Sequence, residues 1–306
     1  MDILNFGSLN IDYVYRVDKF LQAGETKLSK ELKLFCGGKG LNQSIAMARA
    51  GNTVYHGGLL GEDGGMLKDK LAENGVKLDY LMPVPGKSGH AIIQVADSGQ
   101  NCILLYGGTN QTLTKERIDS VLNNFGPDAM LLIQNELNLT DYIIEKAVSR
   151  GIPVAMNAAP MDEKVLSYPI EKLTWLMVNE VEGRALSGVS EDADIIPALT
   201  ERYPGVNILL TLGHRGSMCR YMGRTVFCSA HHVNAVDTTA AGDTFNGYFL
   251  RGILNGLSME RCLELATTAS AICVTREGAS DSVPMAAEVE AVLAGGGLGR
   301  LEIKEL

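Results

Sequence analysis

Short apolar runs alternate with amphipathic helical patterns over most of this chain. Between the apolar runs, helices are expected near residues 40–50, 64–74, 140–150, 179–187 and 191–203. The predicted buried strands are residues 3–9, 52–60, 129–134, 153–157, 174–179 and 206–213. Such alternation predicts an α/β fold with a doubly wound, mostly parallel sheet flanked by helices. Because ligands bind at the carboxyl ends of the strands in such a sheet, functional side chains are expected just after the strands.

Two segments, residues 12–36 and 88–107, break this alternation. Their apolar and polar residues alternate, and they carry turn signals at Ala23-Gly24 and Asp97-Ser98-Gly99. A two-sided sheet of this kind cannot form a core alone, so we expect a small sheet that covers the strand ends as a lid. A surface hairpin without function is the alternative for either segment taken singly.

The C-terminal third is expected to begin with a hairpin around Met222-Gly223. Two long helices are expected to follow, over about 242–255 and 258–275. Neither a repeat nor a linker interrupts the chain, so residues 1–306 are expected to form one domain with the small sheet inserted in it.

Charge and composition exclude several classes of protein. The net charge of -9 argues against binding to nucleic acid or to a membrane surface, because both need clustered Lys and Arg. No segment approaches the roughly 20 apolar residues of a membrane span. The six cysteines are scattered, which is typical of reduced thiols in a cytoplasmic protein.

The segment DTTAAGDTFNGYF, residues 237–249, carries the most chemistry. Ala240, Ala241 and Gly242 leave the backbone N–H groups of a helix start unobstructed, and such a helix end binds anions. Asp243 lies just inside the helix. It is either an ordinary cap or a base that takes the proton of an incoming hydroxyl during phosphoryl transfer.

Two polar patterns near the N-terminus fit the recognition of a neutral polyol. In CGGKGLNQ, residues 36–43, the glycines allow close approach to a ligand, while Lys39 and Asn42 offer polar groups. A flexible joint before a helix is the alternative. Asn10 and Asp12 follow the first strand with side chains on one face, although this pair is also typical of an Asx turn.

Two later strand ends could contact a nucleotide. Residues 211–216, TLGHRG, offer a hydroxyl and open backbone amides, but a glycine-rich turn would look the same. Asn179 and Glu182 end another strand and could contact phosphate or a metal-bound water, whereas a helix cap explains them equally well.

Taken in order, these motifs resemble the ribokinase-like carbohydrate kinases of the PfkB family. The resemblance spans nearly the whole chain, and its two specific motifs are GGKGLNQS (37–44) and DTTAAGDTFNGYF (237–249). Between them lie GGTN (107–110), IQNE (133–136), MNAAP (156–160), VNEVE (178–182) and TLGHRG (211–216). The GGKG-x-N-Q form favours the ribokinase branch over the fructokinase and adenosine kinase branches.

The resemblance implies transfer of the γ-phosphate of ATP to a sugar hydroxyl, most simply from ribose to ribose 5-phosphate. Asp243 would be the general base, and the amides of Ala240, Ala241 and Gly242 would form the anion hole. The sugar would be bound by Asn10, Asp12, Gly38, Lys39, Asn42 and Glu136, and covered by Ala91, Ile93 and Leu105. The nucleotide would be bound by Asn179, Thr211, Gly213 and Gly216.

The resemblance also implies two ions and a partner. Glu182 would hold Mg²⁺ through water, and a monovalent cation, usually K⁺, would be held by oxygen ligands. The residues that match the cation loops are Asp237, Thr239, Cys273, Arg276, Gly278 and Ser282. A homodimer through the lid is implied as well.

Departures from the family pattern leave the substrate open. Many members have glycine at the position of Ala240, although an alanine still leaves its amide accessible. His90 and Tyr106 in the small sheet, and His214 in the nucleotide loop, are positions where substrate preference or adenine packing could differ. Another pentose, a ketohexose or a nucleoside is an alternative substrate. A catalytically silent regulator that binds sugar or nucleotide is an alternative of another class.

Overall fold

A ten-stranded sheet forms the centre of the molecule, and the computed structural model describes all 306 residues. The strand order is β14-β13-β12-β11-β10-β9-β8-β1-β4-β5; all neighbours from β11 to β5 are parallel, and β12 to β14 add an antiparallel edge. The strands of this main sheet are β1 (Asp2–Phe6), β4 (Val54–Leu60), β5 (Leu81–Pro83), β8 (Ala129–Gln134), β9 (Val154–Asn157), β10 (Trp175–Asn179), β11 (Asn207–Thr211), β12 (Ser217–Tyr221), β13 (Arg224–Cys228) and β14 (Ile303–Glu305).

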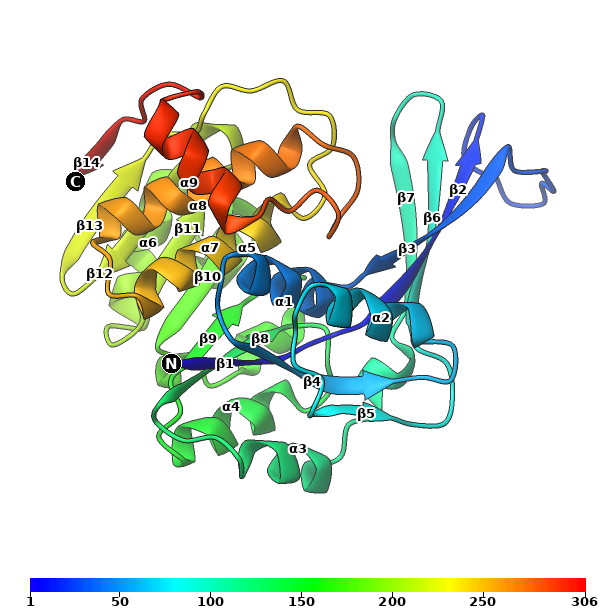
Figure 1. Cartoon of the computed structure of the whole chain (residues 1–306), viewed down its shortest axis with the longest axis horizontal. Helices are drawn as coiled ribbons and strands as arrows, with labels where there is room; N and C mark the ends of the chain where they lie inside the picture. Colours follow the sequence, from blue (N-terminus) through cyan, green and yellow to red (C-terminus); the bar gives the residue numbers. More distant parts are fainter.

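Helices cover both faces of the main sheet, so the predicted doubly wound α/β fold is confirmed (Figure 1). Successive strand residues point to opposite faces: Ile3 packs in one core and Leu4 in the other. One face carries α1 (Lys39–Arg49), α2 (Gly65–Glu73), α7 (Ala241–Leu254), α8 (Met259–Val274) and α9 (Ala286–Gly295). The other carries α3 (Lys115–Leu122), α4 (Thr140–Ser149), α5 (Glu180–Ser187) and α6 (Asp192–Arg202). No helix has the length and apolar character needed to cross a membrane.

The elements expected from the sequence are present, with shifts at their ends. The six predicted strands correspond to β1, β4, β8, β9, β10 and β11, but β1 ends at Phe6 rather than at residue 9. The expected hairpin is formed by β12 and β13, with Met222 and Gly223 at positive φ in its turn. Helices α3 and α9 were not predicted, nor were the short helices η1 (Gly108–Gln111), η2 (Glu163–Ser167), η3 (Ile170–Lys172) and η4 (Gly213–Arg215).

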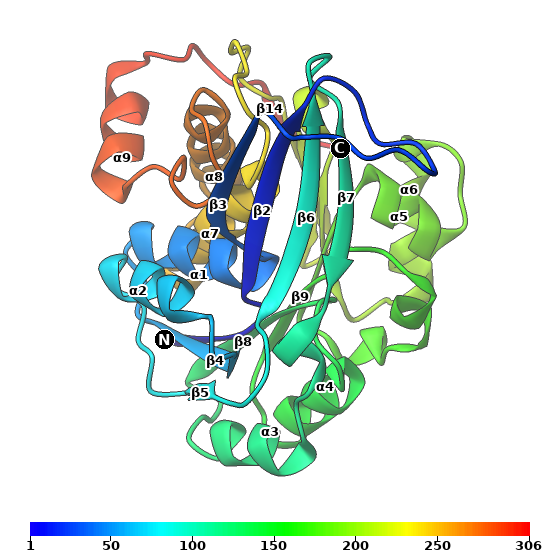
Figure 2. The same cartoon turned by 90° about the vertical axis from the view of Figure 1, so that its right-hand side faces the viewer.

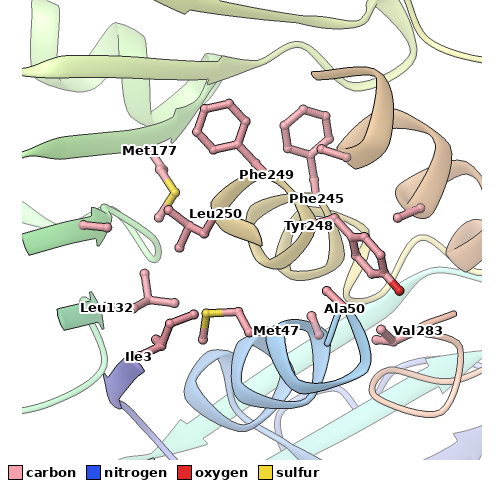
Figure 3. Packing of buried hydrophobic residues seen from close by; sticks show 14 of the residues in the cluster. Ile3, Met47, Ala50, Leu132, Met177, Phe245, Tyr248, Phe249, Leu250 and Val283 are labelled. Carbon is pink, nitrogen blue, oxygen red and sulfur yellow. The ribbon is translucent and has the colours of Figure 1, made fainter. Parts of the chain in front are cut away.

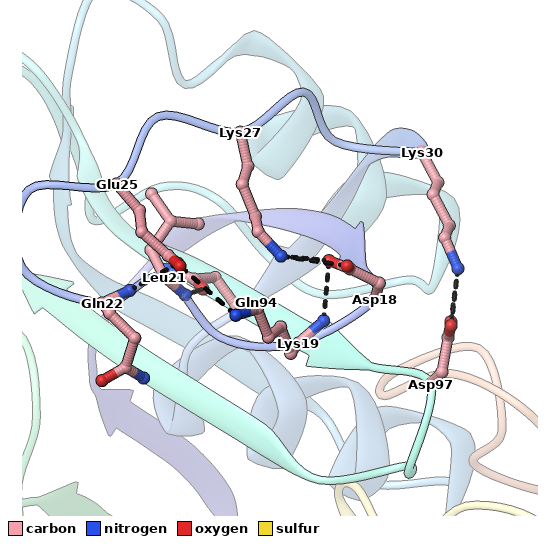
Figure 4. A network of polar contacts seen from close by, with 9 residues as sticks. All are labelled: Asp18, Lys19, Leu21, Gln22, Glu25, Lys27, Lys30, Gln94 and Asp97. Carbon is pink, nitrogen blue, oxygen red and sulfur yellow. Dashed lines mark hydrogen bonds and ion pairs between the residues drawn. The ribbon is translucent and has the colours of Figure 1, made fainter.

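The two irregular segments pair into one small sheet of order β3-β2-β6-β7. It consists of β2 (Asn10–Val17), β3 (Glu31–Gly37), β6 (Gly89–Ala96) and β7 (Asn101–Tyr106). Strands β2 and β6 join the two segments in parallel, and the sheet projects from the main body (Figures 1 and 2). Near its tip, exposed ion pairs join Lys27 to Asp18 and Lys30 to Asp97 (Figure 4). Because exposed pairs contribute only about 0–1 kcal/mol, these pairs add little stability to the projecting tip.

Helices α1 and α7 pack side by side in the same direction on one face of the main sheet (Figure 3). A Cβ at Gly247 would lie 2.6 Å from the Cβ of Ala46, and one at Gly51 would lie 2.4 Å from Arg251 Nη1. The absent side chain at Gly247 therefore allows the two helices to approach closely. Their N-terminal ends consequently lie together, which brings the two specific motifs of the chain into one region.

The main sheet has a switch point between β1 and β8. From β1 the chain continues on one side to β4, whereas β8 pairs with the other side of β1. At such a point the connections after the two strands run in opposite directions and leave a crevice at their carboxyl ends. Residues that follow Phe6 and Gln134 are therefore expected to line a site.

Candidate active site

Two adjoining cavities lie at the carboxyl ends of the main-sheet strands. The first has a volume of about 240 Å³, is lined mainly by polar residues, and has Lys39, Asn179 and Asp243 in its wall. The second has a volume of about 310 Å³ and a mainly apolar wall. The two cavities share the lining residues Thr211, Thr238, Ala241 and Gly242. The start of α7 therefore separates a polar chamber from an apolar one.

The start of α7 is not capped by any side chain. Ala240 adopts the left-handed conformation with φ of 59°, which turns the chain into the helix. The N–H of Ala241 donates to Thr238 O at 3.3 Å, whereas the N–H groups of Ala240, Gly242 and Asp243 have no protein acceptor. Unpaired amides at a helix N-terminus form an anion site.

Asp243 is buried and accepts two hydrogen bonds from the neighbouring helix α1. Asn42 Nδ2 donates to its Oδ2 at 3.1 Å, and Gln43 Nε2 donates to its Oδ1 at 2.8 Å. Since Asp243 makes no capping bond, its carboxylate is directed at α1 and the first cavity rather than at its own backbone. This arrangement fits a base better than a cap.

A second carboxylate, Glu136, follows β8 and meets the start of α1. It accepts hydrogen bonds from Ser8 Oγ and, at 2.9 Å, from the Lys39 backbone N–H. Burial raises the pKa of Glu136, with its bonds to Ser8 and Lys39 opposing that change. Burial also disfavours the Lys39 ammonium, but Asp243, Glu136 and Glu182 outweigh it and raise the pKa of Lys39. A charged lysine thus lies among three carboxylates.

Asp12 lies on β2, directly over the glycine motif that enters α1. A Cβ at Gly37 would meet the Asp12 carboxylate at 2.0 Å, so only glycine fits beneath it. Burial, followed by the charge of Glu136, raises the pKa of Asp12 to about 7. Asn10, on the same strand, accepts a bond from Asn110 Nδ2 at 2.8 Å through its Oδ1. The predicted pair therefore lies against the motifs at residues 37–38 and 107–110, and Asn10 is bonded to the second of them.

Three of the four residues predicted to contact a nucleotide, Thr211, Gly213 and Gly216, line the second cavity. Thr211 lines both cavities, and Gly213, His214 and Gly216 line the apolar one. At Gly216 φ is 110°, and a Cβ would lie 2.1 Å from Cys228 O. Glycine is therefore required at this position of the loop.

Asn179 and Glu182 form a capping box at the start of α5, which was one of the two interpretations left open. The Asn179 side-chain oxygen accepts from the backbone N–H groups of Val181 and Glu182, and the Asn179 backbone N–H donates to Glu182 Oε2 at 2.8 Å. Both residues also line the first cavity, so the cap presents a carboxylate and an amide to it. Burial raises the pKa of Glu182.

Comparison with known proteins gives one consistent result. The pfkB family of carbohydrate kinases matches residues 2–286. The chain is 32% identical to a ribokinase from Haemophilus influenzae over 288 residues, which cover 91% of this chain and 94% of that one. It is also 32% identical to a deoxyribokinase from Salmonella typhi over 296 residues, covering 93% and 96% of the two chains. The structure of Arabidopsis thaliana ribokinase complexed with ribose and ATP matches with a TM-score of 0.83 at 29% identity, covering 95% of this chain and 98% of that one.

This chain belongs to the pfkB family of carbohydrate kinases. The resemblance inferred from the two end motifs is confirmed, and the protein is an ATP-dependent enzyme that phosphorylates a sugar hydroxyl. The alternative of a catalytically silent regulator is therefore wrong.

In this pfkB-family kinase, the segments expected to hold a monovalent cation lie against each other. The Asp237 carboxylate accepts hydrogen bonds from the N–H groups of Thr239, at 2.9 Å, and Gly278, at 3.1 Å. The thiol of Cys273 lies 3.0 Å from Ser282 Oγ and is not exposed. No hydrogen bond of the protein ends on the backbone carbonyls of Asp237, Arg276 or Gly278. These oxygens are the type of ligand that hard cations prefer.

The rings of His90 and Tyr106 lie on the face of the small sheet that does not carry Asp12. Their rings pack together with centroids 4.9 Å apart, and His90 also packs edge-on against Tyr13. The strand register pairs Asp12 with Ala91, and Ala91 with Leu105, so these three share one face of the small sheet. Because side chains alternate along a strand, His90 and Tyr106 lie on the face opposite Asp12.

Several polar residues of the kinase site were not predicted from the sequence. Ser8 binds Glu136, Gln43 binds Asp243, and Asn157 and Asn246 line the first cavity. Ser8 follows β1 and Asn157 ends β9, so the rule that functional groups follow parallel strands would have found them. Gln43 carries no such signal, because it is an interior residue of α1.

Proposed function

We propose that this kinase phosphorylates ribose on its 5-hydroxyl, with Asp243 as the general base. One observation carries the role of Asp243: its buried carboxylate lies beside unpaired backbone amides where the polar and apolar cavities join. The choice of ribose is supported by the similarity to ribokinases. A base next to an anion site is the arrangement that phosphoryl transfer to an alcohol requires.

The reaction follows from these positions. The sugar oxygen attacks the γ-phosphorus while the bond to the bridging oxygen breaks and ADP departs. Asp243 takes the hydroxyl proton, and the free amides of Ala240 and Gly242 stabilise the charge on the transferred group. The Ala241 N–H donates to Thr238 O through a long bond of 3.3 Å, and it could give up this bond to donate to the phosphate instead. General base catalysis of this kind supplies about 10²–10⁴ in rate.

The sugar would be bound between the small sheet and the start of α1. Asn42 Oδ1 is a buried acceptor without a protein partner, as expected of an atom that pairs with a substrate hydroxyl. Glu136, Asp12 and Asn10 add further acceptors, and the Lys39 ammonium adds a donor. The small sheet would act as the lid that excludes water, with Ala91, Ile93 and Leu105 on the face that Asp12 shares.

The second cavity would hold the adenine of ATP. Its wall includes the apolar side chains of Val233, Ala235, Phe245 and Val274, which suit a flat aromatic base. The phosphates would then pass Thr211 and reach the amides at the start of α7, because both segments line the two cavities. Asn179 lies in the wall of the first cavity on this route.

The residues present fit the two expected ions. Glu182 offers an acceptor-only carboxylate in the first cavity, suited to a water of Mg²⁺, and Mg²⁺ neutralises phosphate charge when bound with ATP. The free carbonyls of Asp237, Arg276 and Gly278 would hold K⁺ and so keep the loop before α7 in place. Thr239, Cys273 and Ser282 lie in the same pair of segments.

A homodimer through the small sheet accounts for the apolar side chains exposed there. Ile103, Leu104 and Leu105 of β7 are 56%, 69% and 51% exposed. An exposed apolar strand at a sheet edge is an unfavourable surface for a monomer and is normally covered. Sedimentation equilibrium would test this, and a monomer at micromolar concentration would contradict it.

A coupled assay of ADP release tests the substrate. Ribose should give the highest kcat/KM in a panel of ribose, deoxyribose, fructose, other pentoses and nucleosides, assayed with and without K⁺. Deoxyribose is the second candidate, because the deoxyribokinase of Salmonella typhi is as similar to this chain as the Haemophilus ribokinase. A higher kcat/KM for any other acceptor would overturn the assignment to ribose.

A further inference from the structure

A continuous chain of buried polar side chains runs from Asp243 into the core of the protein. Gln43 Nε2 donates to Asp243 Oδ1 at 2.8 Å, and Gln134 Nε2 donates to Gln43 Oε1 at 2.7 Å. Gln134 Nε2 also donates to Asn5 Oδ1 at 2.9 Å. These residues come from α7, α1, β8 and β1, so the chain of bonds crosses from the helix layer to the two central strands.

The far end of this chain is also anchored. Asn5 Nδ2 donates to Gly40 O at 2.7 Å and to Ser44 Oγ at 2.8 Å. Ser44 Oγ is 2.8 Å from Nδ1 of His56, and burial lowers the pKa of His56 to about 4, so this imidazole is neutral near pH 7. Ser44 Oγ and Nδ1 of this neutral ring therefore share one hydrogen bond at the far end of the network.

The groups at the two ends of this hydrogen-bonded network, Asp243 and the Gly40 carbonyl, fix the orientation of each side-chain amide between them. A carboxylate only accepts, so Gln43 must present its NH₂ group to Asp243 and its oxygen to Gln134. A backbone carbonyl only accepts, so Asn5 must present its NH₂ group to Gly40 and its oxygen to Gln134. Both requirements agree on one orientation for Gln134, with its NH₂ group between the two oxygens. Gln43 consequently cannot turn its donor away from Asp243 without breaking bonds deeper in the core.

Burying these polar side chains lowers the stability of the fold, so their presence in the core is not explained by packing. Asn5, Gln43, Ser44 and His56 are 0% exposed and Gln134 is 1% exposed. Two of their polar atoms, Gln134 Oε1 and His56 Nε2, have no hydrogen-bond partner. A partly satisfied buried network is less stable than an apolar core of the same shape. The network is therefore better explained by its contact with Asp243 than by stability.

We propose that Gln43 is a positioning residue that holds Asp243 Oδ1 from the core side, with Gln134 and Asn5 fixing its orientation. Oδ2 is then the oxygen that receives the proton of the sugar hydroxyl. Its only protein partner is Asn42, through the longer bond of 3.1 Å, and Asn42 is also in the proposed sugar site. This inference rests on the proposed role of Asp243 as the base and specifies how that base is aimed.

The test compares Gln43→Met, Gln134→Met and the double variant with the unmodified kinase. Gln43→Met should lower kcat by about 10- to 100-fold, because a hydrogen bond to a charged group is lost and the base is displaced. KM for sugar and ATP should stay within about threefold, since neither residue contacts them in the proposed site. Gln134→Met should lower kcat by a smaller factor. The double variant should be no slower than Gln43→Met, because the two residues act through one bond.

Two further measurements distinguish a structural role of the network, a failed positioning role and a failed proposed function. They are the melting temperatures of the Met variants and the turnover of Asp243→Asn. A fall in melting temperature with kcat unchanged in Gln43→Met and Gln134→Met would overturn the inference, as would multiplicative losses of kcat in the double variant. If Gln43→Met does not fold, Gln134→Met decides alone, and an unchanged kcat there overturns the inference. If Asp243→Asn keeps normal turnover, Asp243 is not the base, and the inference about Gln43 is overturned together with the proposed function. If Asp243→Asn is inactive while the Gln43 and Gln134 variants keep normal turnover, Asp243 remains the base and only the positioning role of Gln43 is overturned.

Discussion

Asn42 and Asp243 face each other across the contact between α1 and α7, with Asn42 Nδ2 3.1 Å from Asp243 Oδ2. They are separated by 201 positions in the chain and belong to its two specific motifs. The contact depends on the close approach of the helices at Gly247 and Ala46. One amide thus contacts the proposed base with its nitrogen and keeps its oxygen free for the substrate.

Asn42→Leu should weaken sugar binding more than it slows turnover. The substitution removes the unpaired acceptor Oδ1, so a substrate hydroxyl would be left without its partner. We expect KM for ribose to rise by about 10- to 100-fold, with KM for ATP unchanged. Initial rates with each substrate varied in turn measure this. An unchanged KM for ribose would remove Asn42 from the sugar site.

Asp12→Asn should stabilise the protein at alkaline pH while weakening sugar binding. The folded pKa of Asp12 is raised to about 7, so the folded state holds a proton that the unfolded state loses at lower pH. The free energy of unfolding therefore falls as the pH rises from about 4 to about 7, by at most about 4 kcal/mol in total, and this loss is complete above pH 7. Urea unfolding should show the variant more stable than the parent near pH 8, with a smaller difference near pH 5. An equal difference at both pH values would contradict the raised pKa.

His56 should make the fold sensitive to mild acid. Its folded pKa is lowered to about 4, so the unfolded state binds a proton between about pH 6.5 and 4 that the folded state does not. The free energy of unfolding should fall over this range by up to about 3 kcal/mol on account of His56. His56→Asn, which keeps a polar partner for Ser44 and does not titrate, should lose that component. The unfolding curves of both proteins at several pH values measure it, and parallel pH profiles would contradict it.

Ala240→Gly should relieve backbone strain without affecting catalysis. Ala240 has a φ of 59°, a conformation that costs an L-residue roughly 1–2 kcal/mol, whereas glycine adopts it freely. We expect the variant to be more stable by about 1 kcal/mol, with kcat within about twofold because the amide stays open. Ala240→Val, which adds a branched side chain at the same φ, should lose stability instead. Equal destabilisation by both substitutions would contradict the strain.

The layout of the main sheet could be predicted from the sequence because its strands are continuous apolar runs. Helices α3 and α9 could not be predicted in this way, although Thr114 does cap α3 by accepting from the Arg117 N–H. The apolar residues of α9 are mostly alanines, which give a weak helical pattern. Strand β14 has three residues at the sheet edge, too few for a periodic signal.

The candidate site was predictable where one motif carries several functional groups, as around Asp243 and Lys39. It was not predictable where a residue acts through a distant partner. Gln43 and Asp243 are 200 positions apart, and Gln134 meets Asn5 across 129 positions. The face on which His90 lies was also hidden, because alternation fixes faces only once strand register is known.

The most direct test is ribose-dependent ADP release by Asp243→Asn compared with the parent enzyme. Asparagine keeps the shape of the side chain but cannot accept the proton. We predict that kcat falls by about 10²–10⁴, with little change in the binding of ribose and ATP measured by calorimetry. A kcat within about threefold of the parent, with binding intact, would contradict the assignment of Asp243 as the base.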